Sequence, residues 1–161
     1  MTMTNILAQI IEQKKLEIAA LDAVTLRRAA EQSPAPRDFL AAIKRRRFGT
    51  HPSLIAELKR ASPSKGILAP HLDLFQVADI YTQNGASAIS VLTDEKFFMG
   101  SLSTLRELRA RNLKLETSHV TPLLRKDFIL HESQLYESRV NGADAILLIA
   151  AALTDNVLFV D

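Results

Sequence analysis

Two apolar segments of this chain end in charged residues whose types suit anion binding and proton transfer. In the first, LIAELK, Glu57 and Lys59 close a run of mostly aliphatic residues, and in the second, TPLLRK, Lys126 takes the last position. A lysine that is held close to other cations, or partly desolvated, has a lowered pKa and can act as a general acid. These three residues are therefore candidates for a site that binds an anion and transfers a proton.

A regular alternation of strands and helices, beginning near residue 53, must position these residues. The segments SLIAELK, ASAISVLTD, VTPLLRKD and ADAILLIA are typical of strands, the segments between them are typical of helices, and Thr154 begins a further helical stretch. Two of the helices end in Asn-Gly, at Gly85 and Gly142, which favours a left-handed glycine at each helix end. Near-continuously apolar strands that alternate with helices predict a parallel sheet covered by helices, in the α/β class.

Alternation along the strands predicts which side chains meet. Glu57 and Lys59 should share one face of their strand with Ile55, since successive side chains point to opposite faces. The other face carries only apolar residues, expected to pack under helices: Leu54, Ala56 and Leu58. Lys126 likewise shares a face with Leu124 at the end of its own strand. Because parallel α/β proteins place ligand sites at the carboxyl ends of their strands, the charged ends are predicted to meet at one mouth.

Structural alternatives exist for the same residues. Glu57 and Lys59 could form a purely structural ion pair, and Lys126 could extend toward solvent along its aliphatic stem. Lysine and glutamate are almost never fully buried unless they are paired or functional, and the convergence of two charged strand ends favours function. The segment SPSKG could be only a turn, or its hydroxyls and backbone N–H groups could hold a phosphate.

The first 48 residues are predicted to form a separate helical extension. A helix is expected from residue 5 to about residue 31, with Thr4 or Asn5 as its cap, because five apolar residues fall roughly on one stripe: Ile6, Ile10, Ile11, Ile18 and Leu21. The segment SPAPRD ends this helix because proline interrupts helices. A second short helix should begin after Asp38, and the basic run 44–47 is interpreted as its solvated end rather than as a nucleic-acid patch. We therefore divide the chain into an extension, 1–48, and an α/β part, 49–161.

Composition narrows the class of protein further. The chain has no cysteine, so it can have neither a disulfide framework nor a thiolate metal site, and its four histidines are far apart. The net charge of +2 gives little support for a nucleic-acid partner but suits a small anion. We find neither a signal peptide nor an apolar run long enough to cross a bilayer, and expect a cytoplasmic protein.

Four motifs, in chain order, closely resemble successive strands of the indole-3-glycerol-phosphate synthase family: LIAELKRASPSKG, ISVLTDEKFFMGS, PLLRKDFIL and GADAILLIAAAL. The N-terminal helix and PRDFLAAI resemble the N-terminal extension of that family. The resemblance runs from about residue 5 to the end of the chain. It implies a (βα)₈ TIM barrel, of which this sequence holds the extension and roughly the first four βα units.

The resemblance also implies an activity and roles for single residues. Members of the family close the ring of 1-(2-carboxyphenylamino)-1-deoxyribulose 5-phosphate, releasing carbon dioxide and water, in tryptophan biosynthesis, and need no cofactor or metal. By matching motif, Lys126 would be the general acid, Lys59 would bind anionic groups of the substrate, and Glu57 would hold the lysines in place. Five further residues would line the substrate: Ser62 and Pro63 at the phosphate mouth, and Phe98, Phe128 and Leu147 around the anthranilate ring.

The length of the chain departs from the resemblance. A (βα)₈ barrel usually needs about 250 residues, and the second half of the family's barrel, with a second catalytic glutamate and its phosphate loops, is absent from these 161 residues. We therefore expect a fragment, a self-associating chain, or one completed by a C-terminal half-barrel. The expected ligand is a phosphorylated small molecule, with no nucleic-acid or membrane partner. Two alternatives are a non-catalytic fragment and another phosphate-binding barrel enzyme, such as phosphoribosylanthranilate isomerase.

Overall fold

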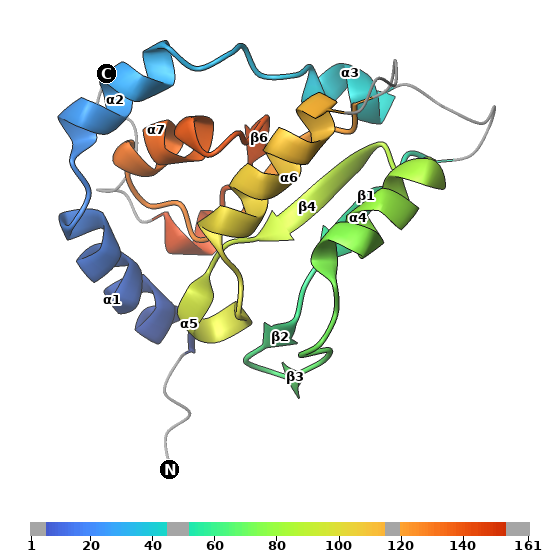
Figure 1. Ribbon diagram of the computed structural model, residues 1–161. Coiled ribbons are helices and arrows are strands. Elements are labelled where there is room, and N and C mark those ends of the chain that lie inside the picture. The colour runs from blue at the N-terminus through green and yellow to red at the C-terminus, as the bar shows by residue number, and fades with distance from the viewer. Residues whose placement is uncertain (1–5, 45–51, 115–119, 154–161) are drawn as a thin grey trace.

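Figure 1 shows a computed structural model, which describes residues 6–44, 52–114 and 120–153. Its centre is a parallel sheet in the order β1-β4-β5-β6. The bounds of these strands are β1 (Ile55–Leu58), β4 (Ala88–Leu92), β5 (Leu123–Lys126) and β6 (Ala145–Ile146). A small antiparallel hairpin follows β1, formed by β2 (Ala61–Ser62) and β3 (Gly66–Ile67). The predicted parallel α/β class is confirmed.

Helices alternate with the strands of the sheet as the sequence predicts. They are α4 (Leu74–Gln83), α5 (Glu95–Phe98), α6 (Leu102–Lys114) and α7 (Ser133–Val140), followed by the short 3₁₀ helix η1 (Ala150–Ala152). Asp73 caps α4 by accepting hydrogen bonds from two backbone N–H groups. Gly85 and Gly142 have φ of 85° and 86°, which confirms the left-handed conformation expected after two helices. The helical stretch expected from Thr154 lies outside the described residues.

The core lies between the sheet and the helices that follow its strands. Leu58, Ile89, Val91 and Leu123 are buried from the sheet side, and they pack against buried residues of the helix layer: Leu74, Ala78, Leu105 and Leu108. All five residues of β4 are buried, as expected of a strand with a neighbour on each side. The prediction that Leu54 packs under the helices with Ala56 and Leu58 is wrong. Leu54 precedes β1 and its side chain is 57% exposed, whereas Ala56 and Leu58 are buried.

The extension forms three helices, α1 (Ile6–Ala19), α2 (Ala23–Glu31) and α3 (Phe39–Lys44). The prediction of one continuous helix to residue 31 is therefore wrong. Asp22 accepts a hydrogen bond from the N–H of Thr25 at 3.1 Å and starts α2, so a cap interrupts the apolar stripe. The cap predicted at Asp38 is confirmed, because its Oδ1 accepts from the N–H of Ala41 at 2.8 Å. The basic run lies mostly outside the described residues.

The extension is fixed to both ends of the sheet. In Figure 1, α2 lies along α7 and α1 lies beside α5. At the amino end of the sheet, the fully buried Asp144 carboxylate accepts hydrogen bonds from the N–H groups of Arg37 and Leu123, both at 2.8 Å. It also pairs with the guanidinium groups of Arg37 and Arg109, each at 3.0 Å. These contacts hold the segment between α2 and α3 against the start of β5 and β6.

No helix in the described ranges is both long and apolar enough to span a membrane.

Candidate active site

The parallel register brings the predicted charged residues together at the carboxyl ends of β1 and β5. Glu57 is level with Ser90 of β4, and Lys126 is level with Leu92, so strand alternation turns Glu57 and Lys126 to the same face. The Nζ atom of Lys126 lies 3.4 Å from Oε2 of Glu57. The Nζ atom of Lys59 lies 2.7 Å from Oε1 of the same carboxylate. One carboxylate therefore bridges two ammonium groups, one from the residue that follows β1 and one from the last residue of β5.

The electrostatics of this group favour binding of an anion. Burial raises the pKa of Glu57, but the hydrogen bond from Lys59 and the charges of Lys126 and Lys59 outweigh that effect, so the pKa lies below its ordinary value. Glu57 is therefore an anion at neutral pH, and it neutralises only one of the two lysines. The three side chains are between 32% and 35% exposed, so a ligand at the mouth can reach them.

The loss of folding stability at acid pH should depend in part on protonation of Glu57. Because its folded pKa is lowered, its stabilising contribution is present above the unfolded carboxyl pKa of about 4.3 and is lost as pH falls through the folded pKa. We expect the urea midpoint of the wild type to exceed that of Glu57→Gln at pH 6, and the margin between the two proteins to be smaller at pH 3.5. Partial exposure limits the difference to about 1 kcal/mol or less. Glu31→Gln, at an exposed helical pair, is the control; an equal margin at both pH values would contradict the prediction.

A mainly apolar pocket of about 440 Å³ contains four of the five residues predicted to line the substrate. Ser62 and Pro63 contribute from the hairpin side, and Phe98 and Phe128 follow β4 and β5. The two phenylalanine rings have their centroids 6.1 Å apart and are tilted by 40°. This separation lies within the range of favourable aromatic contacts, so the two rings together form part of the apolar lining of the pocket. The hydroxyl of Ser62 accepts a hydrogen bond from the N–H of Lys65, so SPSKG forms a tight turn at the edge of the pocket.

Leu147 is the predicted lining residue that the structure places elsewhere. Its N–H donates to the carbonyl of Arg125 at 3.3 Å, and it directly follows β6. Arg125 is level with Ile146, so Leu147 is level with Lys126 on the same face of the sheet. Leu147 therefore lies along the sheet near the level of the lysine, and it does not line the apolar pocket described above.

The extension completes this pocket, which the sequence interpretation missed. Ile6, Leu7 and Ile10 of α1 line it together with the two aromatic side chains. Ile6 and Ile10 were interpreted only as part of a helical apolar stripe. Such a stripe is the same whether it meets a core or a ligand pocket. No local signal in α1 could have distinguished the two.

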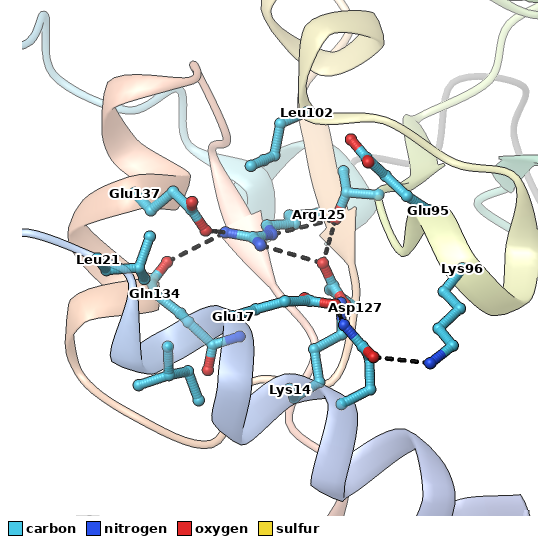
Figure 2. A pocket seen from close by; sticks show the side chains of 13 residues that line it. Lys14, Glu17, Leu21, Glu95, Lys96, Leu102, Arg125, Asp127, Gln134 and Glu137 are labelled. Atoms are coloured by element: carbon cyan, nitrogen blue, oxygen red, sulfur yellow. Dashed lines mark hydrogen bonds and ion pairs between the residues drawn. The ribbon is translucent and has the colours of Figure 1, made fainter.

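A buried network of charges lies on the other face of β5, and the sequence interpretation also missed it. Figure 2 shows Arg125 and Asp127 reaching into a cavity of about 550 Å³ toward Lys14 of α1. Arg125 pairs with Asp127 at 3.0 Å and with Glu137 of α7 at 2.8 Å. The hydroxyl of Thr93 donates to Asp127 at 2.6 Å. The detectable signal was the motif RKD, which places charges on both faces of a buried strand.

The surroundings of Asp127 and Lys14 hold both of these groups in their charged forms. Burial raises the pKa of Asp127, but the positive charges of Arg125 and Lys14 outweigh it and hold the pKa below its ordinary value. Burial lowers the pKa of Lys14, yet the charge of Asp127 and hydrogen bonds to Glu17 and Asp127 raise it well above the usual range. The residues that the structure describes include no group of three His, Asp or Glu side chains arranged to hold a metal ion.

Comparison with known proteins assigns this arrangement of strands and side chains to a family. The sequence profile of the indole-3-glycerol phosphate synthase family matches residues 7–159. The chain belongs to this family. The family fold is a (βα)₈ barrel, and the four parallel strands with their helices form part of such a barrel.

Curated relatives support the same assignment. The indole-3-glycerol phosphate synthase of Chloroherpeton thalassium is 47% identical over 156 residues, which cover 94% of this chain and 57% of the relative. The synthase of Roseiflexus sp. is 46% identical over 160 residues, covering 97% of this chain and 58% of the relative. That of Desulforamulus reducens is 46% identical over 157 residues, covering 95% and 56%. The chain thus spans between 56% and 58% of the length of these synthases.

Proposed function

We propose that this chain supplies part of the active site of an indole-3-glycerol phosphate synthase. The observation that supports the proposal most strongly is the bridge from Glu57 to Lys59 and Lys126, at the carboxyl ends of β1 and β5, which lie on either side of β4. The substrate would be 1-(2-carboxyphenylamino)-1-deoxyribulose 5-phosphate. It would be converted to indole-3-glycerol phosphate, carbon dioxide and water, with no cofactor.

Lys126 would act as the general acid. Its ammonium group would donate a proton to the carbonyl oxygen of the substrate while the ring carbon that carries the carboxylate attacks the carbonyl carbon. The new C–C bond closes the ring, loss of carbon dioxide restores the aromatic ring, and loss of water completes the indole. Glu57 would keep both lysines in place, and Lys59 would pair with anionic groups of the substrate, since each lysine has solvent access.

The apolar pocket would receive the aromatic ring of the substrate. Phe98 and Phe128 would contact its faces, while Ser62 and Pro63 lie at the edge where the phosphorylated chain would enter. Leu147 would contribute apolar contact at the level of Lys126 along the sheet. In this proposal the extension, residues 1–48, is part of the site because α1 supplies one wall of the pocket.

Product analysis would test this proposal. The chain would be mixed with the part of the Chloroherpeton thalassium synthase that lies outside the matched region, supplied as a separate polypeptide. Incubation with substrate should give indole-3-glycerol phosphate, detected by indole fluorescence and mass spectrometry, and each polypeptide alone should give far less. In a parallel incubation, conversion of phosphoribosylanthranilate to its 1-amino-1-deoxyketose isomer, without cyclised product, would support the phosphoribosylanthranilate isomerase alternative. No product from a folded complex in either incubation would support a non-catalytic fragment.

A further inference from the structure

Lys14 of α1 has a role that its position in a surface helix would not predict. Its side chain is only 2% exposed, and its ammonium group contacts three carboxylates. The distances from Nζ are 2.8 Å to Glu17, 3.0 Å to Asp94 and 2.9 Å to Asp127. A lysine is almost never buried so completely unless it is paired. Two of its partners, Asp94 and Asp127, belong to the barrel rather than to the extension, so Lys14 joins the two.

Both of these barrel carboxylates fix the backbone beside an aromatic wall of the pocket. Asp94 caps α5 by accepting from the N–H of Phe97 at 2.7 Å, and α5 ends in Phe98. Asp127 accepts from the N–H of Phe128 at 2.8 Å. The ammonium group of Lys14 therefore lies between the two groups that hold the aromatic side chains of the pocket in place.

The part of the pocket lining that α1 supplies lies on the same helix as Lys14. Ile10 precedes Lys14 by four residues, so the two side chains lie on one face of α1, and Ile10 is buried in the pocket wall. Ile6 lies one further turn toward the start of the helix. A contact that fixes Lys14 against the strand ends therefore also sets how closely Ile6 and Ile10 approach Phe98 and Phe128.

We propose that Lys14 is a positioning residue for binding of the aromatic ring. Its ion pairs with Asp94 and Asp127 hold α1 over the carboxyl ends of β4 and β5, and this closes the apolar pocket around an aromatic carboxylate. The proposal rests on the proposed function, because it takes that pocket as the site of the substrate ring. Lys14 would not contact the substrate itself, and it would act by fixing the position of α1.

Loss of the ammonium group would open the pocket for an electrostatic reason. Without Lys14, Asp94 and Asp127 would be two buried carboxylates with less positive charge beside them, and buried charges need such compensation. The carboxylates would draw water into the boundary between α1 and the strands. Lys14→Arg would keep the charge, and the adjacent cavity of about 550 Å³ gives the larger guanidinium group space.

A binding experiment on the 161-residue chain would test the proposal. The probe is N-methylanthranilate, an aromatic carboxylate whose fluorescence reports on an apolar environment. We expect Lys14→Met to bind it about tenfold more weakly than the wild type, as expected for loss of part of an apolar contact. Lys14→Arg should restore most of the affinity. The matched control is Lys15→Met, because Lys15 is the next residue on α1, is 61% exposed and pairs only within the helix in the described structure.

Hydrogen exchange supplies a second readout on the same proteins. Lys14→Met should speed exchange of the α1 amides and of the Phe98 and Phe128 amides, and leave the amides of α4 unchanged. General destabilisation would instead speed all of them together. If Lys14→Met does not fold, the double variant with Asp94→Asn replaces it, because it removes one buried negative charge together with the lysine and keeps the capping oxygen.

The possible results separate the two proposals. Unchanged affinity and unchanged α1 exchange in the lysine variants would overturn the role of Lys14. A wild-type chain that does not bind the probe would contradict the pocket assignment in the proposed function, and α1 exchange would then still decide whether Lys14 holds the helix. Failure of Lys14→Arg to restore binding, with wild-type exchange, would also overturn the proposal, because charge would then not be the cause.

Discussion

Lys126→Ala should lower kcat by about 10²- to 10⁴-fold, the range expected when a general acid is lost. The assay would use the chain completed by the remainder of a relative's barrel and would follow formation of indole fluorescence. Alanine removes the proton donor but leaves Glu57 paired with Lys59 at 2.7 Å, so the mouth should keep its structure. KM should change less than kcat, because Lys59 and the apolar pocket remain to bind the substrate.

The matched control for this prediction is Lys44→Ala. Lys44 is an exposed lysine at the end of α3, so its removal changes the net charge by the same amount without touching the proposed site. Its kcat should equal that of the unaltered protein. Turnover retained in Lys126→Ala would contradict the proton-donor role and would leave Lys59 as the remaining lysine of the bridge.

Asp127→Asn should lower the free energy of unfolding by about 3 to 5 kcal/mol, the usual cost of breaking a buried ion pair from one side. Asp127 is almost completely buried and is the shared partner of Lys14 and Arg125. The amide would keep an oxygen for the N–H of Phe128, but it would remove the negative charge that compensates two buried cations. Urea unfolding of the chain at pH 7 would measure the loss.

The difference in stability between the wild type and Asp127→Asn should change with pH in a definite direction. The folded pKa of Asp127 is lowered, so its contribution is present above the unfolded pKa of about 3.9 and is lost as pH falls through the folded value. The difference between wild type and Asp127→Asn should therefore shrink below about pH 4. Asp79→Asn, which removes an exposed pair with Arg111, is the control and should cost less than about 1 kcal/mol. A similar small cost at Asp127 would show that the network contributes little to stability.

The strand part of the fold could be predicted from the sequence because its signals are local. Continuous apolar runs and Asn-Gly helix ends marked β1, β4, β5 and the helices between them. Strand alternation was then sufficient to bring Glu57, Lys59 and Lys126 to one mouth, because a parallel register fixes which strand ends are level. The face of a strand on which a side chain lies is thus easier to predict than a contact between elements that are distant in the sequence.

The remaining features depended on contacts that one segment cannot specify. Asp22 interrupts the first helix with a cap, although the apolar stripe continues past it. The network of Asp127 draws its partner Lys14 from a helix that lies more than a hundred residues earlier in the sequence. Leu147 was assigned to the ring pocket by motif, but its place in the sheet follows from the register of β6, which only the fold provides.

A crystal structure of the completed barrel with indole-3-glycerol phosphate would test the central proposal most directly. The account predicts that the indole ring lies in the pocket between Phe98, Phe128 and α1, with the Lys126 ammonium group within hydrogen-bonding distance of the product and Glu57 still paired to Lys59. A product bound elsewhere, with the bridge of Glu57 intact and this pocket empty, would contradict the assignment of the site.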